Sequence, residues 1–238
     1  MATRKNTRPG HGAKEGKRKT RALLHRSYRE KTRNFFISLC VVYSVYMTTP
    51  TSSRIAAAAR RVLDHEGTDA VTMRRVAKSV ALTPMAIYRH YRGRSTLLNA
   101  LANQGFDELA ALLSAKRLSG NVEQRLIQLL DVYLDHGLQN PRLFELMFLT
   151  LRPGARRYPR DFQASRSPTA NLLAELIRDG MVSGHFRKGD VWEIVFAMGA
   201  LSHGLIMLFL GGRTNMTRAQ FREFYRRSFA RYFQGIRK

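Results

Sequence analysis

Residues 72–98 read TMRRVAKSVALTPMAIYRHYRGRSTLL and predict two short helices separated by a tight turn, with a third helix directly after them. Thr72 and Thr83 stand where a helix N-cap is expected. Each has a hydrophobic residue before it and another at the fourth helical position, so each helix start is stapled. Pro84 occupies the first position of the second helix, where its missing N–H costs nothing. This arrangement is typical of a helix-turn-helix that reads DNA.

Each of the two short helices is expected to have an inward and an outward face. The apolar residues at helical spacing are Val76, Ala77 and Val80 in the first helix and Ile87, Tyr88 and Tyr91 in the second. The outward side chains of the second helix are short or basic, which suits a groove walled by phosphate. They are Met85, Ala86, Arg89, His90 and Arg92.

The motif extends over residues 52–110 and resembles the DNA-binding domain of the TetR/AcrR family of bacterial transcriptional regulators. The residues that carry the resemblance are Ile55, Ala58, Leu63, Gly67, Thr72, Val76-Ala77, Thr83, Ile87-Tyr88, His90-Tyr91, Arg94 and Leu97. Three positions depart from the family pattern: Ala81 replaces a turn glycine, Tyr91 a phenylalanine and Arg94 a lysine. We expect the turn at Ala81 to avoid a strongly left-handed φ, because alanine adopts it at a cost.

The resemblance also implies which side chains contact DNA. It assigns phosphate contacts to Thr72, Tyr88, His90 and Arg94, and contacts with base edges or methyl groups to Thr83, Met85, Ala86 and Arg89. Arg74 and Pro84 complete the predicted DNA-binding set. A two-fold homodimer would place two copies of the second helix in successive major grooves, so the double-stranded operator is expected to be palindromic.

The composition favours a nucleic-acid partner over an enzyme. The 238 residues have a formal net charge of +24, which points to an anionic partner. The sequence has no nucleotide-binding loop, nucleophile elbow or metal-ligand spacing, so we expect no catalytic residue, no cofactor and no metal. The single cysteine, Cys40, is compatible with a reducing cytoplasm.

Residues 1–49 differ from the rest of the chain and are expected to form a basic, disordered extension. Residues 1–46 carry 12 Lys and Arg against 2 acidic residues, and residues 35–47, FFISLCVVYSVYM, form an apolar run. Two interpretations are open: translation begins at Met47, or the segment is a functional basic arm. A secretory signal is less favoured, because the basic leader is long and no small-x-small cleavage site follows.

The periodicity of residues 111–238 is helical throughout, so the predicted fold is all-α: a helix-turn-helix domain over residues 50–110, with its motif at about 72–91, and a second helical domain over 111–238. We expect helices over 122–138, 140–151 with Leu151 inward, 172–181 ended by Gly180 and Gly184, 191–210, and 217–236. Residues 191–210 are apolar almost all round. Burial against the core and a second subunit explains this run without lipid, although a membrane-associated basic helical protein is the alternative.

The segments NPRLFELMF (140–148), DGMVSGHFRKGD (179–190) and LSHGL (201–205) resemble the regulatory domain of a TetR subgroup with a Trp-His-Gly signature. His203-Gly204 is present, but the only tryptophan is Trp192. The resemblance implies a homodimeric repressor released by a small apolar or amphipathic effector. The predicted pocket residues are Tyr133, Phe144, Met147, Phe148, Trp192, Phe196, Met198, His203 and Met207. The predicted dimer contacts are Phe221, Phe224, Tyr225 and Tyr232.

Overall fold

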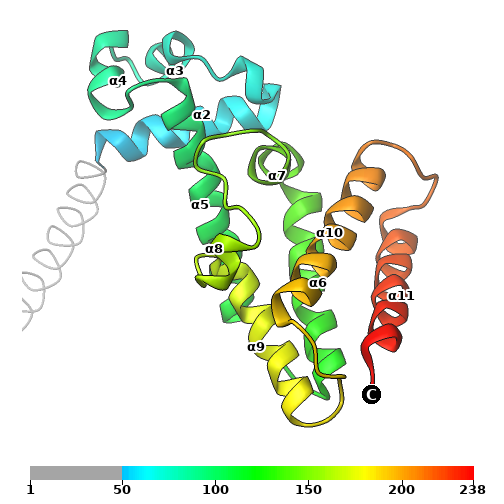
Figure 1. Ribbon diagram of the computed structural model, residues 1–238. Helices are drawn as coiled ribbons and strands as arrows, with labels where there is room; N and C mark the ends of the chain where they lie inside the picture. Colours follow the sequence, from blue (N-terminus) through cyan, green and yellow to red (C-terminus); the bar gives the residue numbers. More distant parts are fainter. Residues whose placement is uncertain (1–49) are drawn as a thin grey trace, which may run out of the picture. The chain divides into compact units, whose positions relative to one another are not determined.

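The computed structural model describes residues 50–238, which form α-helices and one short 3-10 helix and no β-strand (Figure 1). The predicted extension over residues 1–49 lies outside the described residues. The all-α prediction is confirmed. The described elements are α2 (Thr51–Glu66), η1 (Thr68–Ala70), α3 (Met73–Ser79), α4 (Pro84–His90), α5 (Arg94–Ala115), α6 (Val122–Gln139), α7 (Pro141–Phe148), α8 (Arg160–Gln163), α9 (Pro168–Val182), α10 (Val191–Leu210) and α11 (Arg218–Ile236).

The first four helices of the described chain pack around a small apolar core. Ile55, Leu63, Val76 and Ile87 come from α2, α3 and α4, and all are fully buried. Leu97 at the start of α5 is also fully buried, and α5 then continues into the second half of the molecule, where it contacts α6, α7 and α9. One continuous helix therefore belongs to both halves.

Three of the long helices in the second half begin with a side-chain cap, as the sequence pattern favours. Asn121 and Gln124 form a capping box at α6, and Thr217 and Gln220 form another at α11. At α10, Asp190 accepts from the backbone N–H of the second and third helical residues. These caps fix where the helices start, and α6 then packs against α9, α10 and α11.

Two predicted helix ends are wrong. α7 stops at Phe148, and Leu151 is 95% exposed in the following loop, so it does not face inward. α9 runs through Gly180 to Val182. A Cβ at position 180 would lie 2.3 Å from Cδ2 of Phe186, so this glycine permits a close aromatic contact and does not end the helix. The turn that follows uses Gly184, with φ +75°.

Among the described helices, α10 alone has the length and apolar composition of a membrane span, with a mean hydropathy of 1.8. In the structure it lies against α6, α9 and α11, and it buries Val195, Met198 and Ile206. Part of its other side is open, with Leu208 50% exposed. One side of α10 thus packs into the core, whereas apolar side chains on the other side remain exposed.

Candidate nucleic-acid interface and internal pocket

Both helices of the helix-turn-helix begin at the predicted caps, and backbone hydrogen bonds close the turn between them. Thr72 Oγ1 accepts from the N–H of Arg75 at 3.3 Å, and Thr83 Oγ1 accepts from the N–H of Ala86 at 3.2 Å. Between the helices, the N–H of Leu82 donates to the carbonyl of Ala77 at 3.0 Å. Both N-cap predictions are confirmed, and the cap at Thr83 fixes the residue at which α4 leaves the turn.

The expectation for Ala81 is wrong, because its φ is +55°, in the left-handed region. The tight reversal between α3 and α4 requires this conformation whichever residue occupies the position. For a residue with a Cβ it costs roughly 1–2 kcal/mol. The close packing on either side of the turn holds it: Val80 is 9% exposed and Ile87 is fully buried.

α4 buries one residue completely and presents the others to solvent. Ile87 is the buried anchor, whereas Met85 is 72% exposed. Tyr88 is 47% exposed and points outward, although the apolar pattern also placed it on the inward stripe. Ala86 is half-buried. Exposed around them are Thr83, Pro84, Arg89 and His90.

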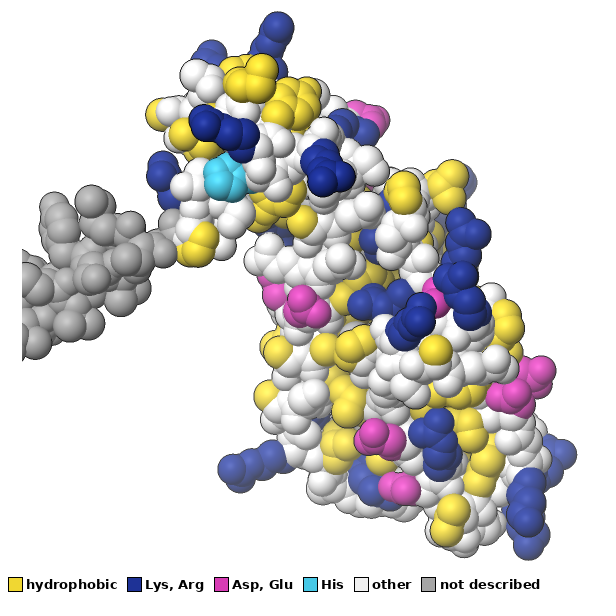
Figure 2. All heavy atoms as spheres, turned by 60° about the vertical axis from the view of Figure 1, so that its left-hand side comes forward, with side chains coloured by type: hydrophobic (Ala, Val, Ile, Leu, Met, Phe, Trp, Pro, Cys, Tyr) yellow, Lys and Arg dark blue, Asp and Glu magenta, His cyan; other side chains and the backbone are white. Residues whose placement is uncertain are grey.

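The N-terminal end of α3 adds further exposed groups beside α4. Thr72 and Arg74 are exposed, while Arg75 forms an ion pair with Glu66 of α2. Figure 2 shows Lys and Arg side chains over this end of the molecule, with a histidine and apolar side chains between them. Basic groups around exposed apolar and hydroxyl groups are what a phosphate-walled groove accepts.

Arg94, a predicted phosphate contact, forms two hydrogen bonds within the chain. Its Nε donates to the carbonyl of Val71 at 2.9 Å, and its Nη2 donates to the carbonyl of Thr68 at 2.7 Å. The guanidinium therefore joins the start of α5 to the segment that leads into α3. Tyr91 makes a similar bond at the end of α4, where its hydroxyl donates to the carbonyl of Ser52 in α2 at 3.1 Å. Burial of this ring raises the pKa of Tyr91.

A pocket of about 310 Å³ lies between α5, α6, α7, α9, α10 and the loop after α7. Five of the nine predicted pocket residues line it: Tyr133, Met147, Phe148, Phe196 and His203. Phe144 and Met198 do not line it, because both are fully buried in the core. Trp192 and Met207 are half-buried away from its lining. The structure therefore brings together five predicted residues from α6, α7 and α10.

Sequence reasoning missed the arginine and aromatic side chains that complete the lining. Arg152 and Arg156 come from the loop after α7, Phe106 from α5 and Phe162 from α8. The five arginines of residues 152–168, against a single acid, were the available signal. Only the packing of that loop against α5 brings two of them into the pocket.

His203 and Tyr133 form a neutral polar pair in the pocket wall. The hydroxyl of Tyr133 hydrogen-bonds with Nε2 of His203. Burial lowers the pKa of His203 to about 4 and raises the pKa of Tyr133 well above its usual value. The ring of Phe148 lies 4.3 Å from that of His203, centroid to centroid. His203 therefore already has a protein partner and is uncharged near neutral pH.

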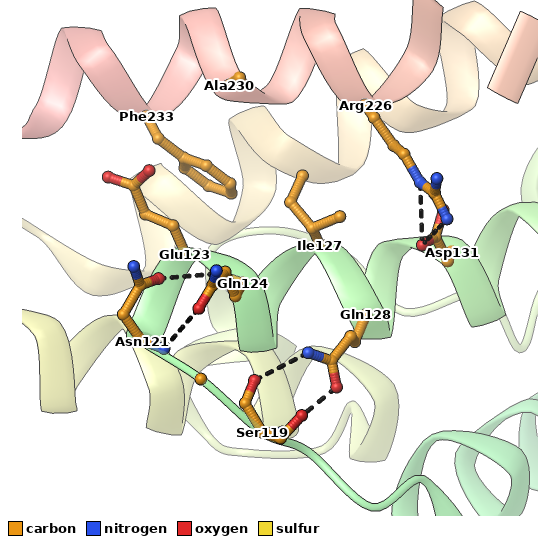
Figure 3. Close-up of a pocket in the computed structure, with 11 residues that line it drawn as sticks. Ser119, Asn121, Glu123, Gln124, Ile127, Gln128, Asp131, Arg226, Ala230 and Phe233 are labelled. Atoms are coloured by element: carbon orange, nitrogen blue, oxygen red, sulfur yellow. Dashed lines mark hydrogen bonds and ion pairs between the residues drawn. The ribbon is translucent and has the colours of Figure 1, made fainter. Parts of the chain in front are cut away.

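A second hollow, of about 510 Å³, lies between the start of α6 and the end of α11 (Figure 3). Its polar groups bind one another: Asn121 pairs with Gln124, Ser119 with Gln128, and Arg226 with Asp131 at 2.8 Å. These contacts complete a helix cap and join α6 to α11. We therefore assign this hollow a structural role.

The predicted dimer residues divide into two pairs. Phe221 and Tyr225 are buried inside this chain, where Tyr225 hydrogen-bonds to Ser202 at 2.6 Å, so the expectation that they meet a second subunit is wrong. Their ridge of α11 packs against α6 and α10 instead. Phe224 and Tyr232 are half-buried at the edge of that ridge, and the hydroxyl of Tyr232 donates to the carbonyl of Ile194 in α10 at 2.9 Å.

Comparison with known proteins places both halves of the chain in one family. Residues 55–101 match the model for bacterial regulatory proteins of the tetR family, and residues 126–232 match that for the tetracyclin repressor-like C-terminal domain. The chain belongs to the TetR family of bacterial transcriptional regulators. The Trp-His-Gly subgroup stays a prediction.

Individual relatives are distant. The uncharacterized HTH-type transcriptional regulator YobS of Bacillus subtilis is 24% identical over 99 residues, 42% of this chain and 52% of that protein, so the match spans about half its length. A protein with unknown function from Rhodococcus sp. RHA1 superposes with a TM-score of 0.67, at 24% identity, over 79% of this chain and 95% of that chain. A TetR variant from Acinetobacter baumannii AYE, solved in complex with minocycline, superposes with a TM-score of 0.56 at 18% identity. The superposition covers 76% of this chain and 93% of that chain. These structures establish the fold.

Proposed function

We propose that this chain is a homodimeric transcriptional repressor that a small effector releases from a palindromic operator in the bacterial cytoplasm. The observation that carries the proposal is the outward face of α4, where Met85 is 72% and Tyr88 47% exposed over a fully buried Ile87. A two-turn helix with one anchored face and an open apolar, hydroxyl and basic face fits the major groove.

The exposed groups divide by the part of DNA that each would contact. Thr83, Met85, Ala86 and Arg89 at the tip and outer side of α4 would read base edges and thymine methyl groups, with Pro84 setting the start of the helix. Thr72, Arg74, Tyr88 and His90 flank them and would bind phosphate. Arg94 supports this surface from behind through its bonds to the carbonyls of Val71 and Thr68.

The uncovered side of α10 is the proposed contact with the second subunit. Ala197, Ala200, Gly204 and Leu208 follow one another at helical spacing and all are exposed. A Cβ at Gly204 would meet nothing within 4 Å, so a partner helix can approach closely there. Contiguous exposed apolar surface of this kind can mark a contact between protein chains. Phe224 and Tyr232 extend the same proposed interface onto α11.

The pocket would hold the effector. Its volume of about 310 Å³ is at the lower end of small-molecule sites. The minocycline complex of the Acinetobacter baumannii protein supports a small-molecule site in this fold. An effector lowers operator affinity only if it favours a dimer whose two α4 helices no longer fit grooves about 34 Å apart.

Selection of bound sequences from random duplex DNA tests the proposal. We expect a palindromic site, and Arg89→Ala should alter the selected sequence at a few base pairs, each worth about 1–3 kcal/mol. Lys188→Ala is the control, because it removes the same charge from the loop between α9 and α10, at the end of the molecule far from α4 (Figure 1). Failure of the wild-type chain to enrich any sequence would refute the proposal.

A further inference from the structure

The pocket of the proposed effector contains two guanidinium groups and no carboxylate. Arg152 and Arg156 line it, and none of the other lining residues is acidic. Neither arginine forms an ion pair within residues 50–238, and the nearby carboxylate of Asp161 is bound by Arg160 and Arg166. The pocket therefore carries positive charge that the described protein does not neutralise.

Arg152 is held rigidly and is 5% exposed. Its Nε donates to the carbonyl of Leu146 at 3.1 Å and its Nη2 to the carbonyl of Met147 at 3.0 Å, at the C-terminal end of α7. Burial and the charge of Arg156 lower the pKa of Arg152. A cation buried against carbonyl dipoles, with a second cation beside it, is stabilised when an anion enters.

Arg156 has the freedom to bind that anion. Its guanidinium lies over the ring of Phe106, 4.6 Å from the centroid, and its Nε donates to the carbonyl of Arg166 at 2.7 Å. The terminal Nη1 and Nη2 groups make no hydrogen bond to the described protein. Two parallel N–H groups on a fixed plane suit a carboxylate, which they bind at two points.

The rest of the pocket is shaped for a flat apolar body. Phe106, Phe148, Phe162 and Phe196 contribute rings from four elements, and Phe148 and Phe106 meet edge to face with centroids 5.2 Å apart. The neutral Tyr133–His203 pair lies in the same lining. Aromatic walls around a flat ring gain from both burial and ring contacts.

We propose that the pocket binds an aromatic carboxylate, with the carboxylate on Arg156 beside Arg152 and the ring between the phenylalanines. This inference rests on the proposed function, because it names the chemical class of the effector. It accounts for the uncompensated arginines and for the aromatic lining with one ligand.

Titration calorimetry with matched probes tests the inference on the full chain. The probes are 2-naphthoate, indole-3-acetate and 4-phenylbutyrate, each compared with its uncharged amide. We expect at least one acid to bind about tenfold or more tightly than its amide, as a charge-assisted bidentate contact provides. Arg156→Gln should remove this preference. Arg157→Gln is the matched control, because the adjacent exposed arginine does not line the pocket.

Three results would overturn the inference: amides that bind as tightly as their acids, a preference that survives Arg156→Gln, or no binding by any of the acids. DNA binding is measured in parallel by band shift without probe. If any of these results is obtained while the chain still binds its operator, the anionic effector is refuted and the proposed repressor function stands. Absence of operator binding refutes the repressor, while the acid-over-amide preference still reports on the pocket.

Discussion

Arg60 in α2 donates from Nη2 to Oδ1 of Asn140 at 2.9 Å, which joins the helix-turn-helix half of the molecule to the corner between α6 and α7. The same guanidinium binds Glu108 of α5 at 3.2 Å. Asn140 in turn donates from Nδ2 to the carbonyl of His136 in α6 at 3.1 Å. Tyr133 of the pocket lies one helical turn earlier, so a movement of α6 has a direct mechanical route to α2.

Asn140→Ala should weaken this connection. We expect the unfolding free energy to fall by about 1.5–3 kcal/mol, because a hydrogen bond to a charged group is lost. The factor by which a bound aromatic acid weakens operator binding should fall by about fivefold, within the usual range of coupling energies. Asp64→Ala is the control, since it removes another partner of Arg60 that belongs to α2 itself. Equal effects of the two variants on this factor would contradict the route through Asn140.

Arg94→Gln should lower stability as well as DNA affinity. The variant loses the fork that holds the carbonyls of Val71 and Thr68, which costs about 1–3 kcal/mol on chemical denaturation. Tyr88→Phe is the comparison, because its exposed hydroxyl has no protein partner in the described chain. It should leave the unfolding midpoint unchanged and weaken binding to all duplexes alike. A normal unfolding midpoint for Arg94→Gln would show that its bonds to the backbone are not structural.

Ala81→Gly should stabilise the protein. Glycine adopts the observed φ of +55° without the Cβ penalty, which exceeds the extra chain entropy that glycine loses. The expected gain is about 1 kcal/mol, or a rise in Tm of about 2–4 °C for a chain of this size. Ala100→Gly inside α5 should instead lower the unfolding free energy, by about 0.5–1 kcal/mol. A lower Tm for Ala81→Gly would mean that the turn is not strained.

Leu208→Glu should convert the dimer to a monomer. The side chain is 50% exposed on the stripe of α10, so the change does not disturb the core, but it places a charge in the proposed interface. Light scattering and band shift should show loss of dimer and of operator binding together. Leu151→Glu, at a 95% exposed position outside the stripe, should change neither. A wild-type chain that is monomeric at micromolar concentration would exclude binding across two grooves.

The His203 ring should make the fold sensitive to acid. Its pKa is about 4 in the folded state against about 6.5 ordinarily, so between these values only the unfolded chain takes up the proton. Proton uptake by the unfolded chain therefore lowers the unfolding free energy. The neutral His203 ring costs no stability above pH 6.5, and the unfolding free energy falls by about 1.4 kcal/mol per pH unit as the pH drops toward 4. Burial raises the pKa of its partner Tyr133, so that phenol stays neutral throughout this window. His203→Gln should therefore reduce the pH dependence of Tm between pH 6.5 and 4 relative to wild type, and part of it should remain because burial also lowers the pKa of His136.

The helix-turn-helix was readable from sequence because its signals are local. Thr72, Thr83 and Pro84 act within one turn of their own position, and a buried Ile87 follows from helical spacing. The same holds for the caps at Asp190 and Thr217. The sequence by itself therefore determined the capped helix starts, the all-α class and the outward face of α4 apart from Tyr88, as well as the family resemblance that its residues carry.

Tertiary structure decided what depends on contacts between distant segments. Local pattern could not tell that Phe221 and Tyr225 fill the core of their own chain, because a helix face is apolar whether it meets α6 or a second subunit. It could not place Arg152 and Arg156 in the pocket, because the sequence of a basic loop does not show whether its side chains face solvent. Their contact with Phe106 joins segments that are far apart in the chain. The roles of Arg94, Gly180 and the turn at Ala81 were decided in the same way, by how closely the backbone of one segment approaches another.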